Sequence, residues 1–523
     1  MAGTYNRSLL KRCRAGLRML WAGFLAVALV WGGLCPPVAI AQSITPSGSI
    51  QPYLDRVAEA VTEFTLDNGM KFIVLERHQA PVVSFMLYAN VGAVNEADGQ
   101  TGLAHYLEHL AFKGTTEIGT TDYASEKELL DEMDQVFDQI LAAQASGNDA
   151  QVEQLQQTLV DLQQQAATYV EQNKFGQIVE QAGGVGLNAT TGADATRYFY
   201  SLPSNRLELW MSLESERFLE PVFREFYEEK DVILEERRMR VDNSPIGTMI
   251  ERFLENAFEE HPYRRPIIGY QEDLFVATRE NVRAFFETYY GPQNLIATVV
   301  GDVDPAQVQE MAEVYFGRFV PRSQPPELVI EPVEQQAPRS FTLRLQTEPW
   351  YLEGYHRPSL NHPDHVVYGI LESLLVRGRT SRLYKSLVDE AQIALDVGSI
   401  NGFPGDKYPN LLLLYGITAP EYTVDDVADM MTAELDRIKS EPVAAEELQR
   451  VKTQARASLL RSLDSNSGMA SLLAAYEAKT GSWRNVFEEL QAIEAVTVED
   501  VQRIAQTVFQ PNNRTVGKLL SQE

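Results

Sequence analysis

The chain of 523 residues is poor in cysteine, and its two cysteines lie close together near the start. Cys13 and Cys35 both fall within the first 41 residues. If that segment is removed, the remaining chain has no thiol. We therefore expect no disulfides, no thiolate metal ligands and no cysteine nucleophile.

Long apolar runs are also scarce, and the one that stands out, residues 19–34, has the setting of a secretory signal. Basic residues precede it, Pro36 and Pro37 interrupt it, and small residues occur before Gln42. We expect a signal peptide at 1–41 that is cleaved near Ala41, an N-terminal segment at 42–60, and export, most simply to a periplasm. An uncleaved membrane anchor is the alternative. No later stretch is apolar enough to cross a bilayer.

Basic residues are much fewer than acidic residues in the rest of the chain. The sequence has 45 basic and 73 acidic residues and a net charge of −28, which becomes −33 without the five basic residues of the signal. Such an acidic surface argues against nucleic acid and anionic lipid as partners and is compatible with cationic peptides. About 480 residues would remain after cleavage, enough for two or more domains.

Two segments that lie 219 residues apart in the sequence are similar to each other. The shared residues are Thr278, Val282, Thr288, Pro292 and Asn294 in the first segment and Thr497, Val501, Thr507, Pro511 and Asn513 in the second. Each segment predicts a threonine-capped amphipathic helix, a proline turn and an apolar strand. Chance similarity between two helix ends is the alternative, but five matches at one offset favour a duplication.

A segment rich in proline, glutamine and glutamate, residues 321–338, predicts an extended linker between the two copies. It divides the chain into a first half, 61–320, and a second half, 339–523. Both halves mix alternating strands with helices of ten or more residues, which is typical of the α+β class. Helical periodicity within 124–174, interrupted at 145–149, predicts a helical hairpin inserted in the first half.

The sequence "HYLEH", residues 105–109, carries the strongest chemical signal. His105 and His109 are one helical turn apart, so both imidazoles can reach one ion, with Glu108 beside them. Zinc with three protein ligands keeps a position for water and makes that water more acidic, and a nearby carboxylate can take its proton. The alternative is a surface helix with unrelated histidines.

A third ligand is needed, and the residues alone do not identify it. The acidic residues of the segment 225–240 are Glu225, Glu228, Glu229, Asp231, Glu235 and Glu236. Most of them could form a charged helix face. Glu229 and Glu236 are seven residues apart, so they share one side of a helix and could both approach a metal.

Together these motifs resemble the insulinase or pitrilysin family of inverted-zincin metallopeptidases, in particular its branch similar to the mitochondrial processing peptidase. The matching segments are "HYLEHLAFKGT", "GLNATTGADATRYFY", "EEKDVILEE", "HPYRRPIIG", "YYGPQNLIATVVGD" and "SRLYKSL". The resemblance covers nearly the whole chain after the signal. It implies an α+β fold of two homologous domains, each an antiparallel-rich sheet packed with helices, which form half of a clamshell with zinc in the first domain and no metal in the second.

The resemblance also implies roles for individual residues. His105, His109 and Glu236 would bind one Zn²⁺ per chain, Glu108 would be the general base, and Glu229 would orient a ligand of the metal. The helical hairpin accounts for a spacing between His109 and Glu236 that is longer than usual in the family.

Substrate recognition is implied for a second stretch, "GLNATT". By the resemblance, Asn188 and Ala189 would pair with the backbone of an extended peptide, which binds as an added strand. For Asn188, a turn residue is the alternative, because Gly186 lies just upstream.

One departure from the family pattern concerns the second half. Related chains often carry an arginine followed seven residues later by a tyrosine, which help to hold the substrate carbonyl and the developing oxyanion. Val388 and Leu395 stand at the matching positions here. We therefore expect a heterodimer with a homologous subunit that lacks the zinc motif and supplies the arginine and tyrosine; a homodimer is the alternative.

These features favour one function and leave one alternative. The favoured function is an exported zinc metalloendopeptidase that cleaves short unstructured peptides inside a closed chamber. The alternative is a non-catalytic structural or binding subunit of a peptidase-like complex. Because all the metal residues are present, catalysis is favoured.

Overall fold

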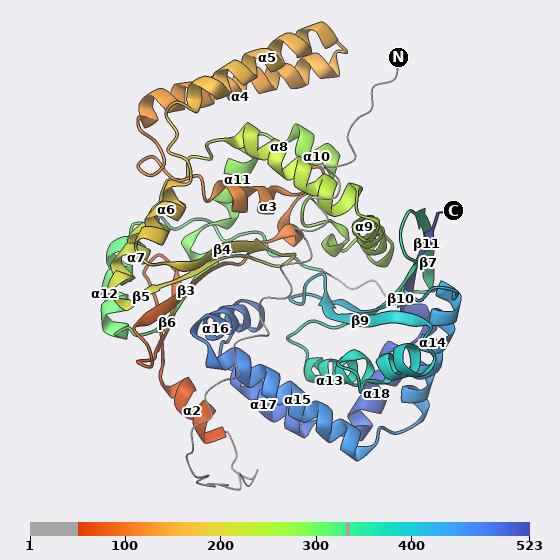
Figure 1. The fold of residues 1–523 in the computed structure, drawn as a ribbon. Coiled ribbons are helices and arrows are strands. Elements are labelled where there is room, and N and C mark those ends of the chain that lie inside the picture. Colours follow the sequence, from red (N-terminus) through yellow and green to blue (C-terminus); the bar gives the residue numbers. More distant parts are fainter. Residues whose placement is uncertain (1–50, 331–334, 523) are drawn as a thin grey trace, which may run out of the picture. The chain divides into compact units, whose positions relative to one another are not determined.

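The structure is a computed structural model that describes residues 51–330 and 335–522 (Figure 1). The signal expected at 1–41, the first part of the 42–60 segment and four residues of the linker lie outside the described residues. Helix α2 (Gln51–Glu59) leads into the first sheet. From residue 52 on, the described residues form one compact unit.

The first sheet has six strands in the order β1-β2-β6-β3-β5-β4. Their bounds are β1 (Val61–Thr65), β2 (Lys71–Glu76), β3 (Val82–Ala89), β4 (Val185–Thr191), β5 (Thr196–Pro203) and β6 (Leu295–Gly301). Only β2 and β6 pair in parallel, and the other neighbours are antiparallel. Strand β4 therefore forms one edge of this sheet.

The second sheet repeats this topology with five strands in the order β7-β11-β8-β10-β9. Their bounds are β7 (Arg339–Leu345), β8 (Trp350–Arg357), β9 (Ala394–Phe403), β10 (Asn410–Thr418) and β11 (Arg514–Ser521). Here β7 and β11 are the parallel pair, and β9 forms the edge that corresponds to β4. The predicted α+β class with antiparallel-rich sheets is confirmed.

The repeated segments found in the sequence have the same local structure. Helices α11 (Arg279–Tyr289) and α18 (Val498–Val508) each begin with a capping box made by a threonine, Thr278 or Thr497. After each helix an asparagine side chain, Asn294 or Asn513, donates a hydrogen bond back to a carbonyl of the last helical turn. The central strands β6 and β11 follow. The predicted duplication is therefore present in the fold.

Helices cover both sheets, some in contact with the strands and others packed on neighbouring helices. In the first half they are α3 (Leu103–Leu110), α6 (Lys174–Gln181), α7 (Leu207–Leu219), α8 (Phe226–Arg237), α10 (Gln271–Val276), α11 and α12 (Pro305–Tyr315). In the second half they are α13 (His365–Val376), α14 (Val424–Ser440), α15 (Ala445–Asp464), α17 (Asn485–Ala495) and α18. Each half buries its own core of aliphatic and aromatic side chains.

Each half also contributes one helix to the sheet of the other half. Helix α9 (Pro245–Ala257) packs on β7 and β11, and α16 (Asn466–Thr480) packs on β3 and β6. Gly354 of β8 leaves room for Phe253 of α9, because a Cβ atom there would lie 2.9 Å from the Phe253 ring. The linker thus separates the two halves in sequence, but the halves pack against each other in the structure.

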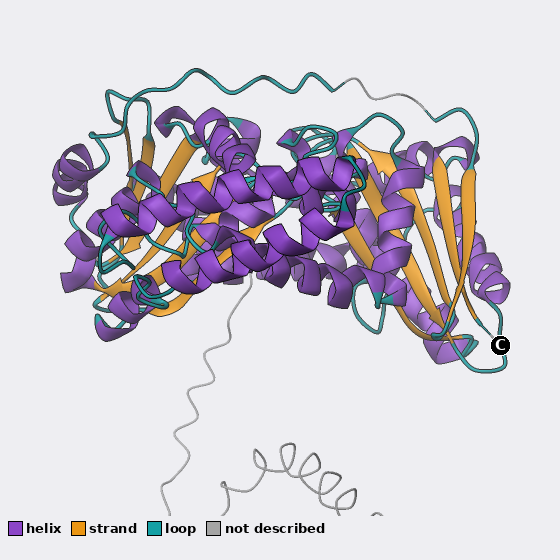
Figure 2. Ribbon diagram, turned by 90° about the horizontal axis from the view of Figure 1, so that it is seen from above, coloured by secondary structure: helices purple, strands orange, loops and turns teal. Residues whose placement is uncertain are grey.

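The predicted hairpin segment consists of α4 (Tyr123–Ala145) and α5 (Asp149–Ala166), which pack against each other and extend beyond the rest of the first half (Figure 1). At its base, the fully buried Arg224 pairs with Glu126 of α4 at 2.8 Å. The described part of the 321–338 linker is an extended loop without helix or strand (Figure 2). Within residues 51–330 and 335–522, no helix is both long and apolar enough to cross a membrane.

The exchange of helices makes Phe253 a critical packing residue. Its side chain is fully buried against the second sheet, so Phe253→Ala should lower the free energy of unfolding by about 3–5 kcal/mol. Phe275→Ala is the matched control, since that ring is 50% exposed on α10 and should contribute less than about 1 kcal/mol. Urea unfolding measures both. Equal losses for the two variants would contradict this account of the packing.

Candidate metal centre

Helix α3, which carries the HYLEH sequence, begins at a glycine in the left-handed region. Gly102 has φ = 87° and lies so close to Ile268 that a Cβ atom would meet its carbonyl oxygen at 2.7 Å. The buried Glu96 accepts hydrogen bonds from the backbone N–H groups of Gly102 and Ala104, both at 2.8 Å. Burial has a larger effect on the pKa of Glu96 than these two N–H donors, which lower it, so the pKa is raised to about 8. The sequence alone did not draw attention to Glu96. The pattern that could have indicated it is an acidic residue shortly before a helix that begins after a glycine.

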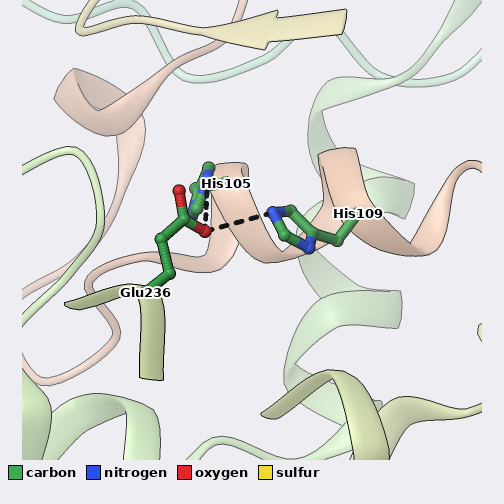
Figure 3. A group of neighbouring side chains, drawn as sticks. All are labelled: His105, His109 and Glu236. Atoms are coloured by element: carbon green, nitrogen blue, oxygen red, sulfur yellow. Dashed lines mark ion pairs between the residues drawn. The ribbon is translucent and has the colours of Figure 1, made fainter. Parts of the chain in front are cut away.

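The two histidines of α3 face Glu236 at the end of α8 (Figure 3). Glu236 Oε2 lies 3.7 Å from His105 Nε2 and 3.5 Å from His109 Nε2. One ligand atom from each of the three residues lies within 4.8 Å of the others. Tetrahedral zinc with ligands at roughly 2.0–2.1 Å needs ligand atoms about 3.4 Å apart. The donor set and its spacing therefore fit zinc, with a fourth position left for water.

No other such cluster occurs within residues 51–330 and 335–522: this is the single place where three histidine, cysteine or acidic side chains could hold an ion. All three ligand candidates belong to the first half. At the positions in the second half where relatives often carry arginine and tyrosine, Val388 packs on the second core and Leu395 is exposed on β9.

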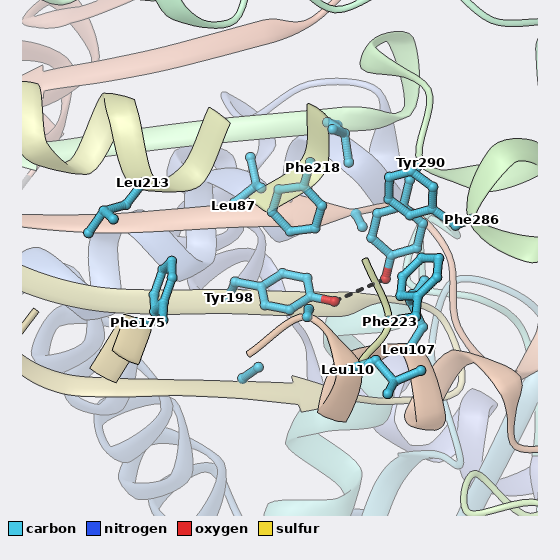
Figure 4. Packing of buried hydrophobic residues seen from close by; sticks show 14 of the residues in the cluster. Leu87, Leu107, Leu110, Phe175, Tyr198, Leu213, Phe218, Phe223, Phe286 and Tyr290 are labelled. Atoms are coloured by element: carbon cyan, nitrogen blue, oxygen red, sulfur yellow. Dashed lines mark hydrogen bonds between the residues drawn. The ribbon is translucent and has the colours of Figure 1, made fainter. Parts of the chain in front are cut away.

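The face of α3 opposite the histidines is locked into the first core (Figure 4). Leu107 and Leu110 pack there with Tyr198 of β5 and Tyr290, which follows α11. The hydroxyl oxygens of these two tyrosines lie 3.2 Å apart. Because this face is fully buried, α3 cannot rotate without opening the core, and the histidines keep a fixed direction.

Glu236 is oriented by an arginine that follows it. Arg240 Nη1 lies 2.8 Å from Glu236 Oε1, so Oε2 is the oxygen that faces the histidines. Arg240 lies in a short π-helix, η3 (Arg238–Asp242), which starts where α8 ends. Insertions of this kind are frequent at functional sites because they turn side chains away from the regular helical positions.

Glu229, two turns before Glu236 on α8, is bound to the far side of His109. Its Oε2 lies 3.0 Å from His109 Nδ1, which leaves His109 Nε2 to face the cluster. Such a carboxylate fixes the tautomer and orientation of a ligating histidine. Lys113 contacts Glu229 on its other oxygen and also lies 3.1 Å from Glu225.

The surroundings shift the pKa values of these groups in different directions. Burial, together with the charges of His109 and Arg240, lowers the pKa of His105 to about 3. Burial also lowers the pKa of His109, but the hydrogen bond with Glu229 and the charges of the nearby glutamates together outweigh burial and raise that pKa above its usual value. Burial raises the pKa of Glu229, whereas His109 and Lys113 bring it below its usual value. His105 is therefore neutral, as a metal ligand must be.

The remaining acidic residues of the segment point elsewhere. Glu235 is about half exposed and pairs with Arg238, and Glu225 accepts a hydrogen bond from Gln172. Glu228 lies in the first turn of α8 and interacts with Gln163. Of the glutamates left open by the sequence, the structure thus brings only Glu229 and Glu236 to the histidines.

Glu108 lies between the histidines in sequence and at the end of β4 in space. Its carboxylate oxygen Oε2 accepts a hydrogen bond from the hydroxyl group of Thr191. Burial raises the pKa of Glu108 above its usual value, while Thr191 and the charge of His109 lower it. A carboxylate placed in this way can exchange a proton with a water molecule at the cluster.

Asn188 and Ala189 both lie in β4, the edge strand next to α3. Asn188 is paired with Phe199 and is exposed, and Ala189 is paired with Tyr198 and is buried. The register of β4 is irregular between residues 185 and 188, around Gly186. Asn188 is therefore a strand residue beside an irregularity. Among the described residues, β4 pairs with β5 alone, so its other edge can accept a strand.

A repeated α+β fold that combines two histidines of one helix with a glutamate of another is characteristic of the inverted-zincin metallopeptidases. Comparison with known proteins agrees with this class. The sequence model described as insulinase (peptidase family M16) matches residues 71–138 and 162–271 and so includes the whole cluster. The model described as peptidase M16 inactive domain matches residues 277–455. The chain belongs to peptidase family M16.

Individual relatives carry related names. The chain is 28% identical over 459 residues to zinc protease PqqE of Helicobacter pylori, which covers 86% of this chain and 90% of that protein. It is 21% identical over 452 residues to a Bacillus subtilis protein named uncharacterized zinc protease YmxG. That alignment covers 86% of this chain and 96% of the Bacillus subtilis protein. The residues between the two matched parts of the insulinase model, 139–161, fall in the α4–α5 hairpin.

Solved structures share the fold. A protease from Helicobacter pylori superimposes with a TM-score of 0.75 at 26% identity and covers 88% of this chain and 99% of that chain. The periplasmic protease PqqL from Escherichia coli superimposes with a TM-score of 0.65 at 18% identity and covers 88% of this chain but only 48% of that chain. PqqL is thus about twice as long as the region that matches.

The contact between His109 and Glu229 generates a prediction about metal affinity. Glu229→Gln should weaken zinc binding by roughly 10- to 100-fold, because the amide holds the His109 ring less firmly and makes it a weaker ligand. Glu235→Gln is the control, since Glu235 lies on the same helix and is exposed, and it should leave the affinity within about twofold. Competition with a chromogenic chelator measures both. Equal affinities for the two variants would remove Glu229 from the metal centre.

Proposed function

We propose that this chain is the zinc-binding, catalytic subunit of an exported metallopeptidase that cleaves short unstructured peptides. The observation that carries the proposal is the convergence of His105, His109 and Glu236 on one point. The Glu108 carboxylate is close enough to this cluster to interact electrostatically with His109 and Glu236. Two imidazoles and one carboxylate are the donor set of a catalytic zinc site.

The chain's own residues would divide the chemistry among them. When bound, zinc would polarise the peptide carbonyl and make a water molecule acidic enough to react near neutral pH. Glu108 would take the proton of that water at its carboxylate and return it to the leaving amine. Glu229 and Lys113 would hold His109 in the tautomer that presents Nε2.

The substrate class follows from the edge strand and the charge. A peptide that adds to β4 beside Asn188 and Ala189 must be extended, so folded proteins would be poor substrates. The net charge of −28 favours the approach of cationic peptides at low ionic strength. Export to a periplasm is supported by the basic, apolar N-terminal segment and by the fold shared with a periplasmic protease.

A homologous partner subunit is the second part of the proposal. Val388 and Leu395 cannot donate side-chain hydrogen bonds to an oxyanion, and this fold covers only 48% of PqqL. A partner that lacks the zinc motif and carries an arginine and a tyrosine would supply the missing donors and close a chamber over the site. A homodimer is the alternative assembly.

The role of Glu108 is tested by Glu108→Gln, which keeps the size of the side chain but cannot accept a proton. The variant should bind one zinc ion per chain, as the wild type does, while its kcat should fall by about 10²- to 10⁴-fold. Metal analysis and hydrolysis of a library of unstructured peptides measure the two properties. If both proteins bind zinc and neither cleaves any peptide, with or without a partner, the chain is a non-catalytic subunit.

The partner is tested separately, with the wild-type chain. Alone it should cleave peptides slowly, and addition of a homologous subunit with the arginine and tyrosine should raise kcat by about 10- to 1000-fold, the range for added oxyanion donors. The control is the same partner with its arginine replaced by alanine. Full activity of the purified chain alone would contradict the argument that a partner supplies the oxyanion donors. It would not contradict the proposed zinc site.

A further inference from the structure

Thr191 links the proposed substrate strand to the proposed base. It is the last residue of β4, and its hydroxyl group donates a hydrogen bond to Oε2 of Glu108. A hydroxyl bound to a carboxylate forms a charge-assisted hydrogen bond, which is stronger than a neutral one. The backbone N–H group of Thr191 also interacts with this carboxylate, so Thr191 holds Glu108 through two groups.

The position of Thr191 on β4 explains why it can reach the helix. Side chains alternate between the two faces of a strand, so Thr191 points to the same face as Ala189. Ala189 is buried and β4 packs against α3, so this is the face toward the helix. The same strand therefore offers its edge to a peptide and one hydroxyl group to the carboxylate of α3.

The second half contains a similar hydroxyl-to-carboxylate bridge, and no metal-ligand cluster lies among its described residues. Helix α13 follows β8 as α3 follows β3, and it packs on the edge strand β9 as α3 packs on β4. Ser399 of β9 donates its hydroxyl hydrogen bond to Glu372 of α13 at 2.6 Å. The two bridges lie at different positions in their strands: Thr191 is the last residue of β4 and is paired with Thr196, whereas Ser399 lies in the middle of β9 and is paired with Leu414.

We propose that Thr191 is a positioning residue that holds Glu108 in its working orientation. The inference rests on the proposed peptidase function. A glutamate side chain has several rotamers, and fixing one oxygen removes most of them before the substrate arrives.

The experiment compares three variants of the full chain with the wild type, with its partner where one is needed. Thr191→Val keeps the shape of the side chain and removes the hydroxyl group, so kcat should fall by roughly 10- to 100-fold, with KM within about threefold. Thr191→Ser restores the hydroxyl group and should return kcat to within about threefold. Ser399→Ala removes the similar hydroxyl-to-carboxylate bridge of the second half and should leave kcat within about twofold.

Two further measurements separate positioning from folding and from binding. Zinc content and thermal unfolding should be the same for Thr191→Ser and the wild type, so this variant remains informative even if Thr191→Val is unstable. On a Glu108→Gln background, Thr191→Val should leave the Kd of a fluorescent peptide within about twofold, because the threonine acts on the base and not on binding.

The outcomes are distinct. Wild-type kcat in Thr191→Val, no rescue by a folded Thr191→Ser, or an equal loss in Ser399→Ala would overturn the inference while leaving the peptidase function in place. A wild type that cleaves no peptide would instead reject the proposed function on which the inference depends.

Discussion

The contact between helices α3 and α8 is the interaction on which the metal centre depends. Tyr106 of α3 stacks on Phe226 of α8 with ring centroids 4.6 Å apart, and its hydroxyl group donates a hydrogen bond to the carbonyl of Phe226. Both rings are fully buried. Residues 120 positions apart in the sequence meet there, and Glu236 reaches the histidines because this contact fixes the distance between the helices.

The duplicated fold explains how one half could acquire chemistry while the other supports it. Both halves share sheet topology, capped helices and a bridge from helix to edge strand, yet the three ligand candidates occur in the first half alone among the described residues. The exchange of α9 and α16 makes the second half part of the packing around the first sheet. The second half, which has no such ligand cluster among its described residues, therefore contributes to the packing of the half that carries the histidines.

Much of this architecture could be predicted from local sequence signals. The helical turn between His105 and His109, the threonine caps and the proline turns depend on neighbouring residues, so patterns reveal them. The pairing of Glu236 with the histidines could not be derived from spacing, because it depends on packing across the insertion, and only the family resemblance pointed to it. Glu96, Arg240, Thr191 and the exchanged helices were missed because their partners lie elsewhere in the fold.

The central claim is that the two histidines and Glu236 share one zinc ion. X-ray absorption at the zinc edge, recorded on the purified protein and on Glu236→Gln, tests it most directly. We expect one zinc per chain with two imidazole nitrogens and carboxylate or water oxygens at roughly 2.0–2.2 Å, and loss of one oxygen ligand or of the metal in the variant. An identical zinc spectrum and content in the two proteins would contradict the account.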